Sequence, residues 1–234
     1  MATYVLVHGA WSGAHGFRHV RRRLQQQRHE VFTPSLTGIG ERVHLVSPEV
    51  GLSTHVHDVV NQVLYEDLED IVLLGFSYGG MVVTGALEHV ASRVRHLVYL
   101  DAFVPDDGQS LVDLTGAPVT APMTVGQAWL VPPPARDFDD PAEAAFSTVR
   151  RTPHPLACFT EPVRLAQPLE DFPFSRTYVR ATADAPDSAG GQAFAAAAQR
   201  ARTSPAWHYH EIATTHMIPS NRPDELATIL TALA

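Results

Sequence analysis

A serine flanked by glycines offers the clearest chemistry in this sequence. The segment Gly75-Phe76-Ser77-Tyr78-Gly79-Gly80 follows an apolar run at 71–74 and precedes a helix-like run at 81–87. Glycines two positions before and two after the serine let the chain turn sharply from a buried strand into a helix. Such a turn lifts the serine hydroxyl out of the sheet, where a base can reach it, so the segment predicts Ser77 as a nucleophile.

A serine hydroxyl is a weak nucleophile and needs a general base. We predict His216 as this base, because it lies in a loop between the last apolar run and the C-terminal helical pattern. His208 and His210 fall inside that apolar run. They and the pair His55 and His57 have a His-x-His spacing that can bind metal, but ordinary surface or core positions explain them better, so we expect no metal.

Two backbone N–H groups are needed to stabilise the oxyanion that forms when a serine attacks a carbonyl. One is expected on the residue after the nucleophile, Tyr78. The other is expected in the loop after the first strand, which contains His8-Gly9-Ala10-Trp11. We predict Ala10 as this second donor, and Gly9 as the residue that lets the loop approach the serine closely.

Two aspartates between Ser77 and His216 are candidates for the acid that orients the base. Asp101 directly follows the apolar run at 95–100, and Asp184 lies shortly after the run at 177–181. Either one keeps the chain order serine, aspartate, histidine. The residues alone leave both open, and the other aspartate would cap a turn or bond to loop backbone.

Short apolar runs separated by helical patterns must position these residues. The runs are typical of parallel strands buried on both faces, and their alternation with helices predicts an α/β fold with a doubly wound, mostly parallel sheet of about six strands. The predicted strands are residues 3–7, 30–33, 70–74, 95–100, 177–181 and 207–212. The predicted helices are residues 17–27, 54–64, 78–89, 194–202 and 223–233.

The alternation breaks in a proline-rich stretch without a clear buried strand. Its large apolar residues need a surface to pack on, which argues against a disordered linker. We therefore predict a core formed by residues 1–105 and 175–234, with a small cap inserted at 106–174 over the carboxyl edge of the sheet. The candidates to line a substrate pocket there are Gly9, Trp11, Phe76, Trp129 and Met217.

Composition limits the classes of function. The 234 residues, 45% hydrophobic and 18% charged, fit one globular domain with a sizeable core. A formal net charge of -8 argues against nucleic acid or an anionic membrane as a partner. The single cysteine, Cys158, excludes an internal disulfide, and the N-terminus lacks the features of a signal peptide. We expect a cytoplasmic protein that binds a small-molecule substrate, with a homo-oligomer left open.

Four segments, at 5–11, 36–42, 77–82 and 97–105, carry a family resemblance. The chain resembles α/β-hydrolases of the group that contains plant methylesterases and hydroxynitrile lyases, and it looks most similar to that group's bacterial ester and carbamate hydrolases. The resemblance weakens in the predicted cap and returns around residues 178–184 and at His216. It implies the α/β-hydrolase fold, with Ser77 as nucleophile and His216 as base.

Individual positions refine this resemblance. Plant methylesterases place the acid at the position of Asp184, whereas the bacterial carbamate-hydrolase-like members favour Asp101, which we prefer. Phe76 stands where many relatives carry histidine, so it bears on substrate choice. Plant lyases carry lysine at the position of Met217 and threonine at that of Gly9, so both positions resemble the esterases.

We therefore expect a carboxylesterase-like serine hydrolase that cleaves a small, mostly apolar ester through an acyl-enzyme and needs no cofactor. The alternatives on the same triad are a carbamate or amide hydrolase and a hydroxynitrile-lyase-type C–C lyase, because the pocket rather than the fold decides the reaction. A further alternative is a non-catalytic member of the same fold that only binds a ligand.

Overall fold

A single six-stranded sheet forms the centre of the computed structural model, which describes residues 1–116, 128–184 and 188–234. The strand order is β2-β1-β3-β4-β7-β8, and every neighbouring pair is parallel. The doubly wound α/β fold predicted from the sequence is confirmed. The strands are β1 (Thr3–Val7), β2 (Glu30–Phe32), β3 (Ile71–Phe76), β4 (Val94–Leu100), β7 (Ser175–Ala181) and β8 (His208–Ile212).

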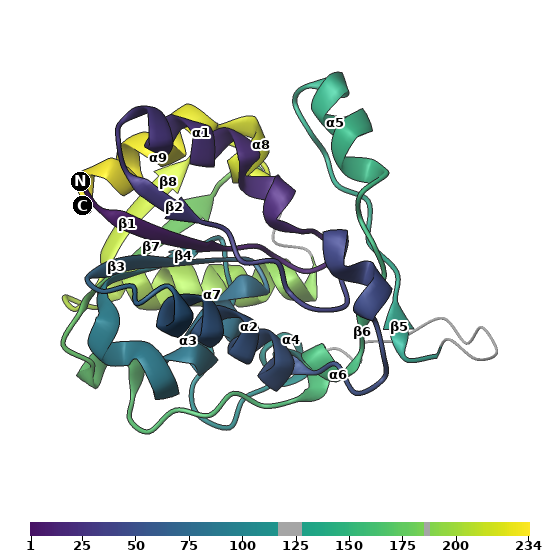
Figure 1. The fold of residues 1–234 in the computed structure, drawn as a ribbon, viewed down its shortest axis with the longest axis horizontal. Helices are drawn as coiled ribbons and strands as arrows, with labels where there is room; N and C mark the ends of the chain where they lie inside the picture. Colours follow the sequence, from purple (N-terminus) through teal and green to yellow (C-terminus); the bar gives the residue numbers. More distant parts are fainter. Residues whose placement is uncertain (117–127, 185–187) are drawn as a thin grey trace.

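Helices cover both faces of this sheet, as Figure 1 shows. Alternate residues of each strand point to opposite faces: Tyr4 and Leu6 pack on one side, and Val5 and Val7 on the other. The first face is covered by α1 (Arg18–Gln26), α8 (Ile218–Asn221) and α9 (Pro223–Ala232). The second face is covered by α2 (Leu52–Tyr65), α3 (Gly79–Val90) and α7 (Ala189–Thr203).

The strand order places a switch point of the sheet beside Ser77. The chain begins at β1 inside the sheet, moves to β2 at one edge, then returns to β3 and continues to the other edge. At such a switch point the loops after two neighbouring strands diverge, and ligands bind in the crevice at their carboxyl ends. Here the two loops follow β1 and β3, and they carry Ala10 and Ser77.

Several short elements lie outside the sheet. In Figure 1, β5, β6 and α5 lie beyond the carboxyl ends of the main strands. The short elements are β5 (Leu130–Val131), β6 (His154–Pro155), α4 (Leu111–Thr115), α5 (Pro141–Thr148) and α6 (Ala157–Thr160), with 3-10 helices at Ala14–Phe17, Gly40–Leu45, Ala91–Arg93 and Leu169–Asp171. Within the described ranges, no helix is long and apolar enough to cross a membrane.

Most element boundaries differ from those predicted by one or more residues, and two of the differences have a clear local reason. Strand β3 continues to Phe76, because the ladder to β4 extends through the pair Phe76 and Leu100. Helix α7 begins at Ala189 rather than 194, since the Ser188 side chain accepts a hydrogen bond from the N–H of Gly191 and caps it. The first turn consists mostly of small residues without an apolar residue at helical spacing, so the sequence pattern did not indicate that the helix begins there.

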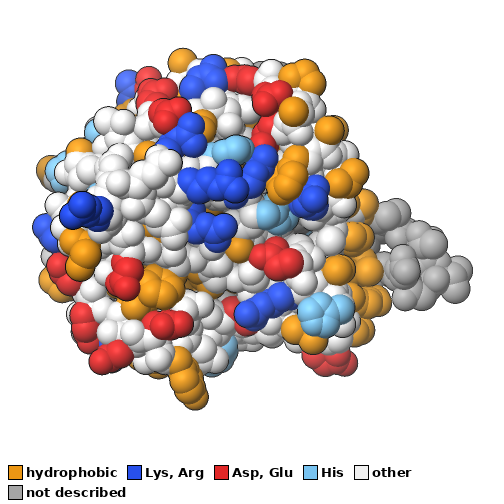
Figure 2. All heavy atoms as spheres, turned by 45° about the horizontal axis from the view of Figure 1, so that its top comes forward, with side chains coloured by type: hydrophobic (Ala, Val, Ile, Leu, Met, Phe, Trp, Pro, Cys, Tyr) orange, Lys and Arg blue, Asp and Glu red, His pale blue; other side chains and the backbone are white. Residues whose placement is uncertain are grey.

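Charges of both signs are interspersed on the face that Figure 2 shows. All 17 basic residues are arginines. Several of them pair with acids across elements, for example Arg23 with Asp224 and Arg18 with the buried Glu143. The second pair ties α1 to α5, so it fixes the segment beyond the strand ends onto the core.

Candidate active site

The turn after β3 holds Ser77 in a strained conformation. Its φ of 56° lies in the left-handed region, which residues other than glycine rarely adopt. A Cβ at Gly79 would lie 2.6 Å from the carbonyl oxygen of Val7, and one at Gly75 would lie 2.5 Å from that of Gly79. Only glycine therefore fits on either side, and the geometry is that of a nucleophile elbow.

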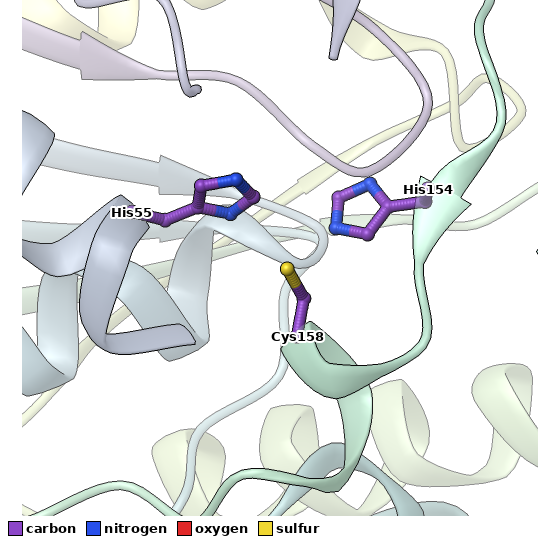
Figure 3. Close-up of side chains that lie close together, drawn as sticks. All are labelled: His55, His154 and Cys158. Carbon is purple, nitrogen blue, oxygen red and sulfur yellow. The ribbon is translucent and has the colours of Figure 1, made fainter. Parts of the chain in front are cut away.

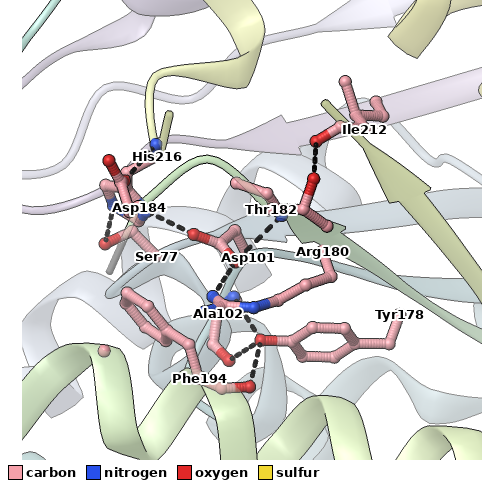
Figure 4. Close-up of polar contacts among 12 residues, drawn as sticks. Ser77, Asp101, Ala102, Tyr178, Arg180, Thr182, Asp184, Phe194, Ile212 and His216 are labelled. Carbon is pink, nitrogen blue, oxygen red and sulfur yellow. Dashed lines mark hydrogen bonds and ion pairs between the residues drawn. The ribbon is translucent and has the colours of Figure 1, made fainter. Parts of the chain in front are cut away.

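A continuous chain of hydrogen bonds links Ser77, His216 and Asp101 (Figure 4). The Nε2 atom of His216 lies 2.9 Å from Ser77 Oγ, and its Nδ1 atom lies 2.7 Å from Asp101 Oδ2. A carboxylate only accepts, so Nδ1–H donates to it and Nε2 is left to accept the serine O–H. The three residues are 7%, 6% and 1% exposed, so bulk water competes little for these bonds.

The two candidate acids contact different parts of His216. Asp101 contacts the ring, while Asp184 Oδ2 accepts the backbone N–H of His216 at 2.5 Å. The other carboxylate oxygen of Asp101 forms an ion pair with Arg180 and accepts the N–H of Ala181 at 3.2 Å. Asp101 is therefore held from both sides, and Asp184 supports the loop that carries the histidine.

Two contacts of this site were not predicted from the sequence. They are the ion pair of Arg180 with Asp101 and the stacking of Phe194 on the ring of His216. Arg180 could have been predicted to have a buried acidic partner, because it is a charged residue in a strand that is buried on both faces. The His216 ring is stacked between Phe76, with centroids 4.8 Å apart, and Phe194, with centroids 5.1 Å apart. No pattern pointed to Phe194, because the contact depends on where α7 packs.

The expected oxyanion donors lie beside Ser77. Ala10 and Tyr78 both line the cavity in front of Ser77. In the part of the chain that the structure describes, neither backbone N–H forms a hydrogen bond with another protein group. A Cβ on Gly9 would lie 2.9 Å from the Cβ of Ser77, so glycine is needed for this close approach. The geometry leaves two amides available to a substrate oxygen.

A large cavity of about 500 Å³ opens in front of Ser77 and His216. Two of its charged lining residues, Arg136 and Asp137, come from the loop between β5 and α5, and Arg180 and Asp184 come from β7 and the loop after it. Most of the remaining lining is apolar and comes from the core and the short elements alike: Trp11, Phe103, Leu111, Val131, Phe159 and Phe194.

A narrow cavity of about 30 Å³ lies against the same serine. Gly9 and Phe76 line this narrow cavity only, while Trp11 and Met217 line both cavities. The expectation for Trp129 was wrong: it lines neither cavity, and its backbone carbonyl accepts the N–H of Leu156 as part of the pairing beside β5 and β6.

Three side chains near Tyr78 could in principle hold a metal. The donor atoms of His55, His154 and Cys158 lie within 4.8 Å of one another, and all three residues are fully buried (Figure 3). Burial lowers the pKa of His55 to about 4 and that of His154 well below its usual value, and it raises the pKa of the Cys158 thiol to about 12. The cluster therefore consists of neutral groups near pH 7.

The hydrogen bonds of the two rings do not suit a metal. His55 Nε2 lies 2.8 Å from the carbonyl oxygen of Thr37 and must donate to it, so Nδ1 accepts the hydroxyl of Tyr78 at 3.0 Å. His154 Nδ1 accepts the backbone N–H of Trp11 at 3.3 Å, so its Nε2 carries the proton. Each lone pair that a metal would need is thus already used or protonated.

We expect buried histidines to make the fold sensitive to acid. Burial lowers the pKa of His8 and His55 to about 4, so between about pH 6.5 and pH 4 the unfolded state binds protons that the folded state refuses. The free energy of unfolding therefore has its full value above about pH 6.5. Between about pH 6.5 and pH 4 it should fall by about 1.4 kcal/mol per pH unit for each such histidine.

Urea unfolding near pH 7, 6 and 5 measures this effect, and His55→Asn should reduce the slope. Carboxylates with lowered pKa, such as Glu143 at about 2, add their own loss only at lower pH. Equal unfolding free energies at the three pH values would contradict the prediction.

The chain belongs to the α/β-hydrolase family, because residues 4–229 match the model of that family. It is 35% identical over 249 residues to the carbendazim hydrolyzing esterase of Nocardioides sp. (strain SG-4G), and the match covers 100% of both chains. It is 29% identical over 109 residues to an α-hydroxynitrile lyase of Arabidopsis thaliana, covering 44% of this chain and 40% of that one. A methylesterase structure from Arabidopsis superposes with a TM-score of 0.77 at 19% identity, covering 99% of this chain and 98% of that one, which shows a shared fold.

These relatives confirm the family resemblance predicted from the sequence. Esterases are among them, including the relative that matches over the whole length. The prediction of a serine hydrolase that acts on esters is confirmed at this level.

Proposed function

We propose that this protein is a carboxylesterase that works through an acyl-enzyme on Ser77. The observation that carries the proposal is the His216 ring, which is bonded to Ser77 Oγ on one side and to Asp101 on the other. Such a ring can take a proton from the serine while a fixed negative charge stabilises the cation that forms.

The geometry supports a sequence of proton transfers. His216 Nε2 takes the Ser77 proton as Oγ attacks the ester carbonyl, and the N–H groups of Ala10 and Tyr78 bind the resulting oxyanion. The imidazolium, paired with Asp101, then protonates the leaving alcohol. Water enters in the place of the alcohol, loses a proton to His216 and hydrolyses the acyl-enzyme.

The two cavities at Ser77 support an ester with unequal halves. A cavity of about 500 Å³ is in the range that holds small-molecule ligands, and its lining is mostly apolar. The narrow cavity of about 30 Å³ has room for a group of about the size of one water molecule. We infer that the larger apolar half of the substrate fills the first cavity and that a group of about methyl size enters the second.

A second candidate activity is the hydrolysis of carbendazim. It is supported by the 35% identity to the carbendazim hydrolyzing esterase over the whole of both chains. The lyase alternative has weaker support, because its relative matches only 44% of this chain.

We also propose that residues 106–174 form a cap on a core of residues 1–105 and 175–234. Leu111, Val131 and Phe159 come from this segment and line the large cavity. The segment is therefore placed to select the small-molecule substrate.

We expect the size of the smaller half to limit hydrolysis. p-Nitrophenyl acetate and methyl 4-nitrobenzoate each have one half that fits the narrow cavity, so both should be hydrolysed. p-Nitrophenyl octanoate has two large halves, and its kcat/KM should be at least about tenfold lower, since each extra methylene in a closed pocket is disfavoured.

Release of nitrophenol and of nitrobenzoate measures these rates, with carbendazim and a cyanohydrin assayed in parallel. A kcat/KM for p-nitrophenyl octanoate equal to that for p-nitrophenyl acetate would refute the inference that one half of the ester must fit the narrow cavity. Cleavage of the cyanohydrin without ester hydrolysis would replace the esterase proposal by the lyase.

A further inference from the structure

The side chain of Tyr78 is anchored on α2, while its backbone N–H is one of the two proposed oxyanion donors. Tyr78 is fully buried, and its hydroxyl donates to Nδ1 of His55 at 3.0 Å. His55 belongs to α2 and is itself fixed, because its Nε2–H donates to the carbonyl of Thr37 at 2.8 Å. The residue that carries one oxyanion donor is thus tied to α2.

The residue after the other donor is anchored in a similar way. Trp11 follows Ala10 and has a φ of 60°, a strained left-handed conformation that persists only where the surroundings hold it. Its backbone N–H donates to His154 Nδ1 at 3.3 Å, and its carbonyl accepts the N–H of Thr152 at 3.2 Å. Its indole N–H donates to the carbonyl of Val131 at 2.9 Å. The loop after β1 is thereby fastened to the segment around β5 and β6.

The two anchoring imidazoles meet each other, as Figure 3 shows. The ring centroids of His55 and His154 lie 5.5 Å apart with the planes at 84°. His154 also packs against the ring of Tyr78, with centroids 4.9 Å apart. One buried pair of neutral rings therefore links both donor-bearing loops.

We propose that His55 and His154 are positioning residues of the oxyanion hole, which hold the amides of Tyr78 and Ala10 at a fixed separation. The inference rests on the proposed esterase function. An oxyanion hole works because its donors are oriented before the charge develops, so a small displacement weakens binding of the transition state more than binding of the substrate. Substrate binding depends mainly on the apolar cavity and should change little.

Matched substitutions distinguish the effect of losing the hydrogen-bond acceptor from the effect of changing the volume of each ring. In His154→Asn the amide oxygen can accept the Trp11 N–H near the place of Nδ1, whereas His154→Phe fills the space without an acceptor. His55→Asn and His55→Phe form the same comparison for the Tyr78 hydroxyl. His57→Asn is the control, because His57 lies two positions away on α2 and is exposed.

Each phenylalanine variant should lower kcat by about ten- to a hundredfold, which is less than the loss of a whole oxyanion donor, with KM within about twofold of wild type. Each asparagine variant should stay within about fivefold of wild-type kcat, and His57→Asn should match wild type. Thermal melting identifies the folded variants to compare.

The second readout is an aryl trifluoromethyl ketone, which adds to the serine and forms an oxyanion, beside the matching methyl ketone. The phenylalanine variants should lose affinity for the trifluoromethyl ketone by the same factor as kcat and keep their affinity for the methyl ketone. Equal kcat in the phenylalanine and asparagine variants would overturn the inference, and so would a kcat loss without loss of trifluoromethyl ketone affinity.

Two further outcomes are distinguishable. A wild-type protein that neither hydrolyses esters nor binds the trifluoromethyl ketone would refute the esterase function itself. Zinc bound in a one-to-one ratio, with activity lost on chelation and restored by zinc, would overturn the positioning role, because a metal would need the lone pairs that these hydrogen bonds use.

Discussion

Replacing Ser77 by alanine should abolish ester hydrolysis while the fold stays intact. The variant removes the only atom that forms the acyl-enzyme, so kcat should fall by about 10⁴-fold or more. Alanine carries the same Cβ as serine and is strained to a similar extent at a φ of 56°, so the melting temperature should change little. The hydrolysis rate of p-nitrophenyl acetate, measured beside thermal melting, checks both parts.

The residual rate decides this prediction. More than a tenth of the wild-type kcat in folded Ser77→Ala protein would refute Ser77 as the nucleophile. Reaction of the wild type, but not of the variant, with a fluorophosphonate probe gives an independent control.

Asp101→Asn should reduce kcat far more than Asp184→Asn. An amide at position 101 can present its NH₂ to the ring, which favours the wrong imidazole tautomer and leaves the developing cation unpaired, at a cost of about 10²–10⁴ in kcat. At position 184 the amide oxygen still accepts the backbone N–H of His216, so we expect a loss of less than about tenfold.

The two variants control for each other, since both remove a carboxylate that contacts His216. Asp101→Asn also loses the ion pair with Arg180, so its kcat is to be compared at a temperature where melting shows it to be folded. A strongly reduced kcat in Asp184→Asn beside a kcat close to wild type in Asp101→Asn would reverse the assignment of the acid.

Local patterns were enough to predict the sheet and the sharp turn that carries Ser77. The strands are short apolar runs, and the elbow needs glycines at fixed distances from the serine, so both are visible in a few consecutive residues. The loops that carry Ala10 and Ser77 follow from the same strands, because the carboxyl ends of parallel strands meet at one edge of the sheet.

Contacts between distant residues could not be predicted in this way. Asp101 and Asp184 both follow strands, and a φ of 40° at Asp101 is part of the backbone geometry that brings its carboxylate to the His216 ring. The bond from Trp11 to His154 spans 143 residues of sequence, and no local pattern records it. Trp129 was expected in the pocket because it is large and apolar, but a residue type does not say which way the side chain points.

Other expectations from the sequence stay predictions. The boundaries of the cap, the cytoplasmic location and the homo-oligomer depend on properties outside the fold and family described above. The proposed function depends most on one step, the transfer of the acyl group to Ser77.

Trapping the acyl-enzyme tests whether Ser77 carries the acyl group during turnover. Wild-type protein is mixed with p-nitrophenyl acetate, quenched in acid while turnover continues, digested and analysed by mass spectrometry. We expect an acetyl group on the peptide that contains Ser77, at the serine itself. We also expect a longer-lived adduct in a His216→Gln variant that has been acetylated, because deacylation has lost its base. Ester turnover without acetylation of Ser77, or with the acetyl group carried stoichiometrically by another residue, would contradict the proposed function of Ser77.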